Sequence, residues 1–342
     1  MSDYKVKFFD PGRWFENHED EMMVEIRRVL RAGDLILRKD VEIFEENLAK
    51  YVGTKYAIGL NSGTDALYLA LRYLKIGRGD EVLVPSYTFV STVQVVKQLK
   101  AIPVQYDLDS SLEELPKVQF KAFICAHLEG SRDRGFSGLL HRVYQGTPLI
   151  EDACQALGAI KNPTSFAQAW SFYPAKILGA YGDAGALTMN DENLYNWVKE
   201  ARNHFKNTNE DWGINSRMDN LQAAILNVKF KYLPEVLAAR QGIASHYSEG
   251  LDTIKELILP VHSEGRVWQD YVIRTIFRDK LYEFLKEKGI ETLKNNYPFP
   301  IKKLFFAQAY EDETLRLPCN ETLTKSEVDY VIKSVCEFYG RK

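Results

Sequence analysis

Short apolar strands that alternate with helices are the feature that most restricts how this chain can fold. Helices are predicted over Ala66–Leu74 and, after Phe89, up to about Leu99, each between two strand-like runs. Strands separated by helices form a mostly parallel sheet in an α/β fold, and ligands bind such sheets at the carboxyl ends of the strands. The apolar runs are Tyr56–Leu60, Glu81–Pro85, Ala101–Tyr106, Phe120–Ala126, Pro148–Ile150 and Ala184–Met189.

A glycine-bearing turn, Asn61-Ser-Gly-Thr-Asp65, joins the first strand to the first of these helices. This order aims free backbone N–H groups and the positive end of a helix dipole at one point, which suits a phosphate. The alternative is an ordinary N-cap, in which Ser62 or Thr64 closes the helix and no ligand binds.

Chemically distinctive side chains follow three other strands, namely Phe89, His127 and the pair Glu151-Asp152. Asp152 is the most informative, because an acid that ends an apolar strand faces either solvent or a cationic partner. The alternatives are a helix cap for Asp152, a core aromatic for Phe89 and a hydrogen-bonded core histidine for His127.

One lysine, Lys176, lies among small residues between two apolar runs, in the stretch Trp170–Gly185. Pro174 disfavours a helix before it, and the glycines after it leave the backbone bare, so a planar ligand could lie close to the chain. Burial would lower the pKa of the amine and make it reactive towards carbonyl groups, as in pyridoxal phosphate enzymes. The alternative is a surface lysine in a glycine-rich loop.

Composition restricts the class of partner. With 342 residues, 45% of them hydrophobic, the chain can bury a core for one large domain and a smaller one. A net charge of -3, with both signs interspersed, gives no basic face for nucleic acid and no cationic helix for a membrane, so small molecules are the expected partners. The four cysteines lack the paired spacing of a metal site. Together with the absence of a signal-like or membrane-spanning run, they predict a cytoplasmic protein without a bound metal.

Two domains are expected. A predicted capping box, Ser216-Arg-Met-Asp219, opens a long helix that Pro234 breaks. We therefore expect residues 1–234 to form a large cofactor-binding domain and residues 235–342 a smaller α+β domain. A second capping box, Thr324-Lys-Ser-Glu327, precedes the last helix of the chain.

Five separated motifs occur in one order along the chain: Asn61–Leu67, Pro85–Val90, Glu151–Gln155, Ser171–Lys176 and Asn215–Asp219. Together they resemble the motifs of the DegT/StrS family of sugar aminotransferases, which are pyridoxal phosphate enzymes of fold type I. Each motif alone is weakly specific, but their order and setting agree over nearly the whole chain.

The resemblance implies a role for each side chain that would contact the cofactor ring. Lys176 would hold the cofactor as a Schiff base, and Asp152 would pair with the pyridinium nitrogen and keep it protonated. Gln155 would hydrogen-bond the ring hydroxyl. Phe89 would stack on the ring and fix its plane.

The phosphate residues are also implied by the resemblance. The backbone of Gly63, Thr64 and Asp65 would cradle the phosphate, with help from the Ser171 hydroxyl. Asn215 resembles an asparagine that reaches the phosphate from the neighbouring subunit. A homodimer with shared active sites is therefore expected.

The implied reaction consists of two half-transaminations. An amino acid, probably L-glutamate, would leave its nitrogen on the cofactor, which then passes it to a keto group of a nucleotide-linked deoxysugar. One alternative is another reaction on the same cofactor, such as racemisation. A second is a pyridoxal phosphate-binding sensor or partner protein without turnover, although Lys176 and Asp152 argue against it, because binding alone needs no electron sink.

The chain departs from the family pattern on the substrate side. Asn295-Asn296-Tyr297-Pro298 and Ile301-Lys302-Lys303 stand where relatives usually carry two histidines. Segments 128–147 and 161–169 are shorter than usual, and Leu37-Arg38 replaces a common glycine. All these departures lie outside the cofactor residues, so they concern the identity of the acceptor substrate and not the cofactor. Lys302 would face either the substrate diphosphate or solvent.

Overall fold

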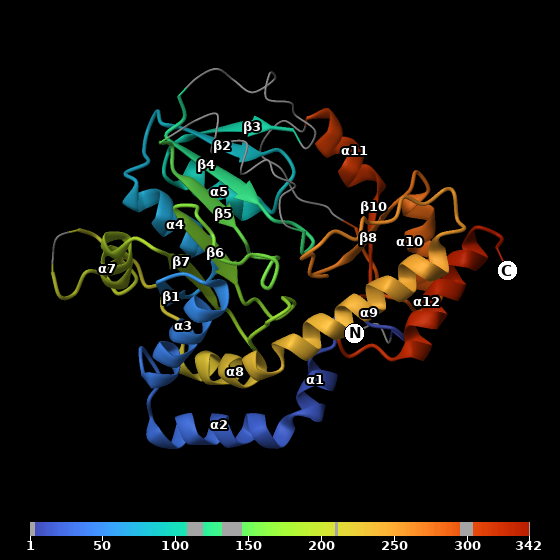
Figure 1. The fold of residues 1–342 in the computed structure, drawn as a ribbon, viewed down its shortest axis with the longest axis horizontal. Coiled ribbons are helices and arrows are strands. Elements are labelled where there is room, and N and C mark those ends of the chain that lie inside the picture. The colour runs from blue at the N-terminus through green and yellow to red at the C-terminus, as the bar shows by residue number, and fades with distance from the viewer. Residues whose placement is uncertain (1–3, 108–118, 132–145, 209–210, 295–303, 342) are drawn as a thin grey trace.

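The computed structural model describes residues 4–107, 119–131, 146–208, 211–294 and 304–341. Seven strands of this part form one sheet (Figure 1). They are β1 (Tyr56–Leu60), β2 (Glu81–Pro85), β3 (Ile102–Tyr106), β4 (Ala122–Ala126), β5 (Leu149–Asp152), β6 (Ala167–Ser171) and β7 (Gly185–Met189).

The strand order in this sheet is β1-β7-β6-β5-β4-β2-β3. Neighbours from β6 to β3 pair in parallel, whereas β7 runs antiparallel to both β6 and β1. The mostly parallel sheet predicted from the alternating pattern is therefore confirmed. Its parallel strands end on one edge, where β4 and β5 place residues 126 and 152 in register.

Helices cover both faces of the sheet. Apolar side chains of α4, α5 and α7 pack with Ile58, Val82 and Ile150 in one buried cluster. Those of α3 and α8 pack with Trp170 and Ala186 in another. The helices of this part are α1 (Pro11–Asn17), α2 (Glu19–Ala32), α3 (Lys39–Val52), α4 (Gly63–Tyr73), α5 (Val90–Gln98), α7 (Glu192–Ala201) and α8 (Asn220–Lys231).

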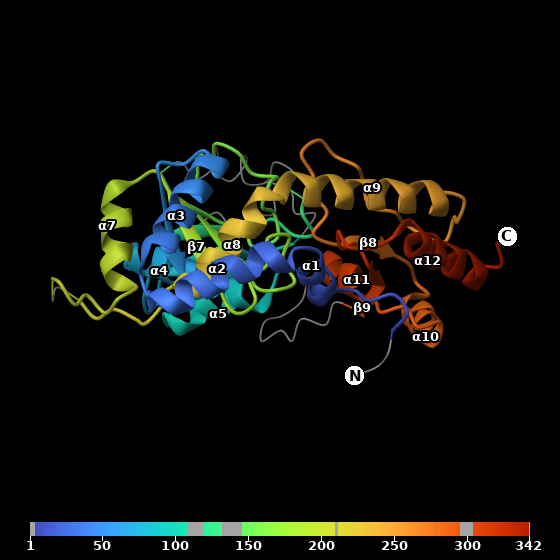
Figure 2. The ribbon, with the colours of Figure 1, turned by 90° about the horizontal axis from the view of Figure 1, so that it is seen from below.

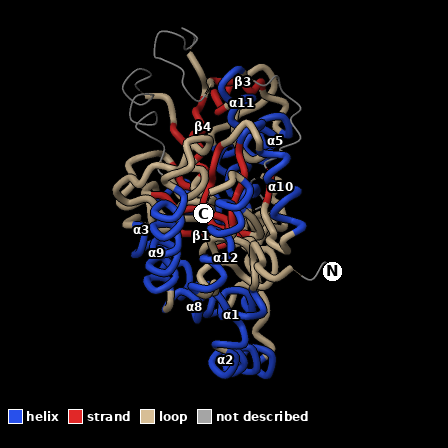
Figure 3. The backbone as a smooth tube through the Cα atoms, turned by 90° about the vertical axis from the view of Figure 1, so that its right-hand side faces the viewer, coloured by secondary structure: helices blue, strands red, loops and turns tan. Residues whose placement is uncertain are grey.

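A long helix, α9 (Leu233–Leu251), leads from α8 to a second, smaller sheet of order β8-β10-β9 (Figure 2). All its strand pairs are antiparallel, and its apolar residues form a separate buried cluster. Figure 3 views the molecule from the side of the last helix. The elements are β8 (Tyr271–Arg274), α10 (Arg278–Glu287), β9 (Leu293–Lys294), α11 (Phe305–Glu313), β10 (Thr314–Leu317) and α12 (Lys325–Phe338).

The chain's beginning joins this C-terminal part. The backbone N–H of Lys5 donates to the carbonyl of Gly289 at 2.8 Å, and Val6 pairs in parallel with Ile290. None of the described helices is long and apolar enough to cross a membrane.

Two capping boxes were predicted, and the structure has one of them. At α12 the Thr324 hydroxyl accepts from the Glu327 N–H, and the Glu327 carboxylate accepts from the Thr324 N–H. The box predicted at Ser216 is wrong, because α8 begins only at Asn220. The Ser216 hydroxyl instead donates to the Asp65 carboxylate at 2.7 Å.

Leu37 adopts a φ of 49°, in the left-handed region that favours glycine. Leu37 belongs to the pair Leu37-Arg38, which stands where the family pattern commonly has a glycine. The residues that replace the two family histidines, Asn295, Asn296 and Lys302, lie outside the described residues, as does much of segment 128–147.

Candidate active site

A cavity of about 540 Å³ opens at the carboxyl ends of the parallel strands. The end of β5, the N-terminus of α4, the segment after β6 and the residues just before β8 form its walls. Seven of the nine predicted site residues line it: Gly63, Thr64, Phe89, Asp152, Gln155, Ser171 and Lys176.

Lys176 lies in a turn in which its N–H donates to the carbonyl of Tyr173 at 2.8 Å. The segment is folded tightly, since a Cβ atom on Gly179 would lie 2.0 Å from the Pro174 carbonyl oxygen. Burial lowers the pKa of the Lys176 amine, although nearby Cys154 and two carboxylates act in the opposite direction. Lys176 lines the cavity and is only partly exposed, which favours the cavity lysine over the surface alternative.

Asp152 ends β5, is buried and lines the same cavity. The Thr92 hydroxyl donates to its Oδ2 at 2.6 Å, and the Cys154 N–H donates to its Oδ1 at 3.3 Å. The Thr88 hydroxyl lies 2.8 Å from that of Thr92. Because the Thr92 proton is directed to the carboxylate, Thr88 is the donor in this second bond. Two hydroxyls in series thus fix the carboxylate, and it caps none of the described helices.

The N-terminus of α4 meets the cavity through Gly63 and Thr64. Ser62 caps this helix by accepting the Asp65 N–H at 3.1 Å, whereas the N–H groups of Gly63 and Thr64 donate to no other described group. Gly63 has no room for a side chain, because a Cβ atom would lie 2.5 Å from Cys154 Sγ. The predicted cap is therefore confirmed, and it leaves two N–H groups at the start of α4 whose setting fits a phosphate group.

Three further predicted residues complete the cavity wall. The Gln155 Oε1 accepts the Glu129 N–H at 2.8 Å, which leaves the Gln155 NH₂ group as a donor. Phe89 precedes α5 and is 48% exposed, so its ring is accessible and is not part of the core. Ser171 ends β6, and its hydroxyl accepts the Tyr173 N–H at 3.3 Å.

Two predicted residues, Asp65 and Asn215, do not line the cavity of this chain. The Asp65 N–H and carboxylate are bonded to Ser62 and Ser216, respectively. Asn215 is exposed and pairs with Asn203 in an isolated bridge.

The family model of the DegT/DnrJ/EryC1/StrS aminotransferase family matches residues 16–336. The chain belongs to this family. The resemblance and the α/β fold predicted from the sequence are thereby confirmed, and the protein is an aminotransferase.

Relatives of this aminotransferase match it along most of their length. A dTDP-3-amino-3,4,6-trideoxy-alpha-D-glucose transaminase from Streptomyces venezuelae is 34% identical, over 98% of this chain and 97% of the relative. A UDP-2-acetamido-2-deoxy-3-oxo-D-glucuronate aminotransferase from Pseudomonas aeruginosa is also 34% identical, over 92% of each chain. The crystal structure of S. venezuelae DesV in complex with a ketimine intermediate superimposes with a TM-score of 0.91 at 32% identity, covering 98% of this chain and 99% of that one.

The structure adds residues to the aminotransferase cavity that sequence reasoning missed, above all Gln269 and Asp270. Both are buried just before β8, and the Arg316 guanidinium donates to the Asp270 carboxylate at 2.6 Å. The signal in the sequence was the polar pair itself, Gln269-Asp270, between Trp268 and Tyr271. The pattern of apolar residues around Gln269 and Asp270 gave no reason to assign them a role.

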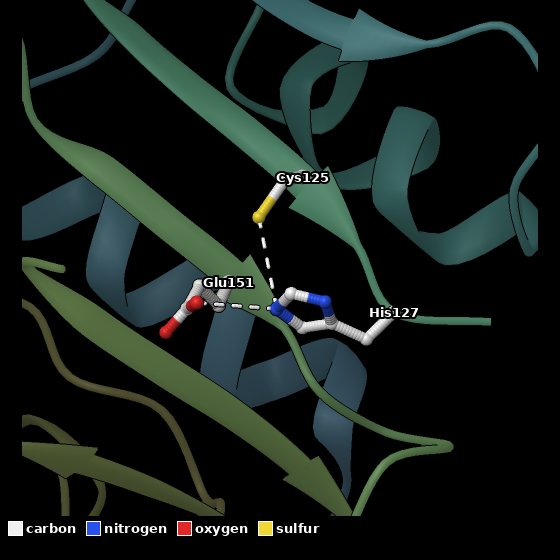
Figure 4. Close-up of side chains that lie close together, drawn as sticks. All are labelled: Cys125, His127 and Glu151. Atoms are coloured by element: carbon white, nitrogen blue, oxygen red, sulfur yellow. Dashed lines mark hydrogen bonds and ion pairs between the residues drawn. The ribbon is translucent and has the colours of Figure 1, made fainter. Parts of the chain in front are cut away.

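His127 also lines the cavity, and its Nε2 lies 3.2 Å from Glu151 and 3.8 Å from the sulfur of Cys125 (Figure 4). All three are buried, and the Ser165 hydroxyl donates to the second Glu151 oxygen at 2.6 Å. His127 is therefore a hydrogen-bonded core histidine with one side towards the cavity, which combines the two interpretations of the sequence.

Proposed function

We propose that this aminotransferase uses pyridoxal 5'-phosphate to move an amino group from an amino acid to a keto group of a nucleotide-linked deoxysugar. The observation that carries the proposal is the shared cavity of Lys176 and Asp152, with N–H groups of α4 at its edge that donate to no group among the described residues. When bound, the cofactor supplies a conjugated ring that withdraws electrons from the carbon that bears the amine.

Lys176 is assigned two tasks. Its Nζ would hold the cofactor covalently and, once released, would be the base that moves a proton between the two carbons beside the nitrogen. The neutral amine is needed for both tasks. Burial favours that neutral form by lowering the pKa of Lys176.

Asp152 is assigned to the ring nitrogen. Its carboxylate would hold a proton on that nitrogen, and the bonds from Thr92 and Cys154 keep it in position. The NH₂ group of Gln155 would donate to the ring hydroxyl. The ring of Phe89 would lie against the face of the cofactor and fix its plane.

The phosphate is assigned to the N-terminus of α4. The N–H groups of Gly63 and Thr64 and the Ser171 hydroxyl would donate to it, and the dipole of this 11-residue helix favours its negative charge. Asp65 would contribute to the same end of the site through its place in the first turn of α4. Asn215 would reach the phosphate of a second subunit, because it is exposed and lies outside its own cavity.

The substrate class rests on the relatives. Both act on sugars linked to a nucleoside diphosphate, one with dTDP and one with UDP in its name. We therefore assign the acceptor to a keto sugar of this kind, and the donor to an amino acid such as L-glutamate.

Borohydride reduction tests the centre of the proposal. Purified protein loaded with pyridoxal phosphate should, after reduction and digestion, carry the cofactor on Lys176 in the mass spectrum. Modification of another lysine, or of none, would refute the assignment. Adding L-glutamate before reduction should release the lysine. A racemase or a non-catalytic sensor would not be converted to the pyridoxamine form by glutamate. A panel of dTDP- and UDP-linked keto sugars then identifies the acceptor.

We also propose a cytoplasmic homodimer with shared active sites, in which each chain divides near residue 234. The four cysteines all lie in the described part and form no disulfide with one another, which is consistent with a reducing compartment. Mixing Lys176→Ala chains with Asn215→Ala chains tests the shared site. Mixed dimers would contain one site with both defects and one with neither, so activity should reappear. No recovery after proven subunit exchange would contradict the proposal.

A further inference from the structure

The side-chain amide of Gln269 bonds to the backbone on both sides of the cavity lysine. Its Oε1 accepts the Ile177 N–H at 3.1 Å, and its Nε2 donates to the Ala175 carbonyl at 2.9 Å. Lys176 lies between these two residues, in a turn that belongs to no helix or strand. The two backbone groups therefore have no partner from secondary structure, and Gln269 supplies both partners.

The backbone of Gln269 is itself held in place by hydrogen bonds from Arg240. The buried guanidinium of Arg240 donates from Nη1 to the backbone carbonyls of Trp268 and Gln269, each at 3.1 Å. Nε and Nη2 of the same arginine donate to the Glu321 carboxylate at 3.0 and 2.7 Å. The amide thus acts from a fixed support, which is what a precise hydrogen-bonding clamp requires.

A second glutamine makes the same pair of bonds further along the segment. Gln222 accepts the Tyr181 N–H on Oε1 at 3.0 Å and lies 3.3 Å from the Tyr181 carbonyl through Nε2. Tyr181 is five residues beyond Lys176, and Gln222 does not line the cavity. The chain therefore contains a matched control, with equal chemistry on the same segment but away from the amine.

We propose that Gln269 is a positioning residue that holds the backbone of Lys176 so that its Nζ meets the reacting carbon atom. Gln269 couples the small-sheet end of the molecule to the lysine segment, and its loss affects the chemistry of the amine more than the binding of a ligand in the cavity. This inference rests on the proposed function, because it assumes that Lys176 bonds to pyridoxal phosphate. In that step Nζ forms a C=N bond to the aldehyde carbon, and the aldehyde oxygen leaves as water.

Two ligands separate positioning from binding. Pyridoxamine phosphate would occupy the same cavity under the proposed function but has no aldehyde, so its dissociation constant reports the cavity alone. The rate at which added pyridoxal phosphate bonds to Lys176, followed by absorbance and by borohydride trapping, reports the amine. A displacement of the amine by about 1 Å costs on the order of 100-fold in rate.

The expected result for Gln269→Ala is a covalent rate lower by on the order of 100-fold, with pyridoxamine phosphate affinity within about threefold of wild type. Gln222→Ala should match wild type in both. Gln269→Glu keeps an acceptor for Ile177 but not the donor to Ala175, so its rate should be intermediate. Gln269→Glu also provides the test if Gln269→Ala does not fold.

Three outcomes would overturn the inference. They are a wild-type covalent rate in both Gln269 variants, equal slowing in the Gln222 variant, and loss of pyridoxamine phosphate binding in folded Gln269→Ala and Gln269→Glu proteins. Failure of the proposed function gives a different result, because wild-type protein itself would then not bond pyridoxal phosphate through Lys176.

Discussion

Lys229 is a buried lysine whose charge should make the stability of the protein depend on pH. Its side chain lies in the interior, its Nζ donates to the Gly179 carbonyl at 2.6 Å, and it faces the rings of Trp14 and Tyr181 at 4.7 and 5.2 Å. Burial lowers the pKa of Lys229 from 10.5 to about 8. Lys229→Met removes the titrating group and keeps the long apolar stem.

The direction of the change in stability with pH follows from the number of protons that the folded and the unfolded chain bind. Between about pH 8 and about pH 10.5 the unfolded chain keeps the Lys229 proton while the folded chain has lost it, so stability rises with pH in this window. The full change in the pKa of Lys229 corresponds to about 3 kcal/mol in the free energy of unfolding. From about pH 7 to about pH 9.5, the free energy of unfolding of wild type should rise by about 2 kcal/mol relative to Lys229→Met.

Urea denaturation at both pH values, at one protein concentration, measures this difference. Lys231→Met is the control, because Lys231 is exposed and hydrogen-bonds to Glu21, which raises the pKa of the lysine. Lys231 stays mostly charged in both states at both of these pH values and should show no such change. If the free energy of unfolding changes by the same amount between the two pH values in wild type and in Lys229→Met, the argument that burial disfavours the charged form of Lys229 is refuted.

The remaining predictions concern the cavity. Asp152→Asn should fold and bind cofactor but slow the glutamate half-reaction by orders of magnitude in stopped-flow absorbance, and a near-normal rate would show that Asp152 has another role. Thr92→Val removes the 2.6 Å bond to that carboxylate, worth about 1.5–3 kcal/mol, so the same rate should fall about 10- to 100-fold, whereas Thr92→Ser should restore it. Gly63→Ala should weaken pyridoxal phosphate binding in a fluorescence titration, because its Cβ would lie 2.5 Å from Cys154 Sγ; the double variant with Cys154→Ala should recover affinity. If the double variant binds no better, this close contact is not the cause.

Most strands of the large sheet could be predicted because they are short apolar runs between turn residues. β6 was missed because its sequence, Ala-Gln-Ala-Trp-Ser, contains no β-branched residue and has a glutamine at its second position. In the fold Gln168 is buried, since its Oε1 accepts the Thr188 hydroxyl and its Nε2 donates to the Ser165 hydroxyl, each at 2.7 Å. A polar residue is compatible with a core strand only when such partners are present, and Thr188, which lies on the neighbouring strand β7, cannot be recognised from the sequence around Gln168.

The same reasoning explains which site residues the sequence could predict. Lys176 and Asp152 are recognisable from their immediate neighbours, because each carries a charged group between an apolar run and small residues. Thr92 and Gln269 act through partners about 60 and 90 positions away, so their spacing gives no signal. Ser216 shows the reverse error: its neighbours match a helix cap, but the Asp65 carboxylate competes for its hydroxyl and the helix starts four residues later. The residues to which we assign chemistry could thus be proposed from local sequence, whereas the residues to which we assign positioning became visible only through contacts made by folding.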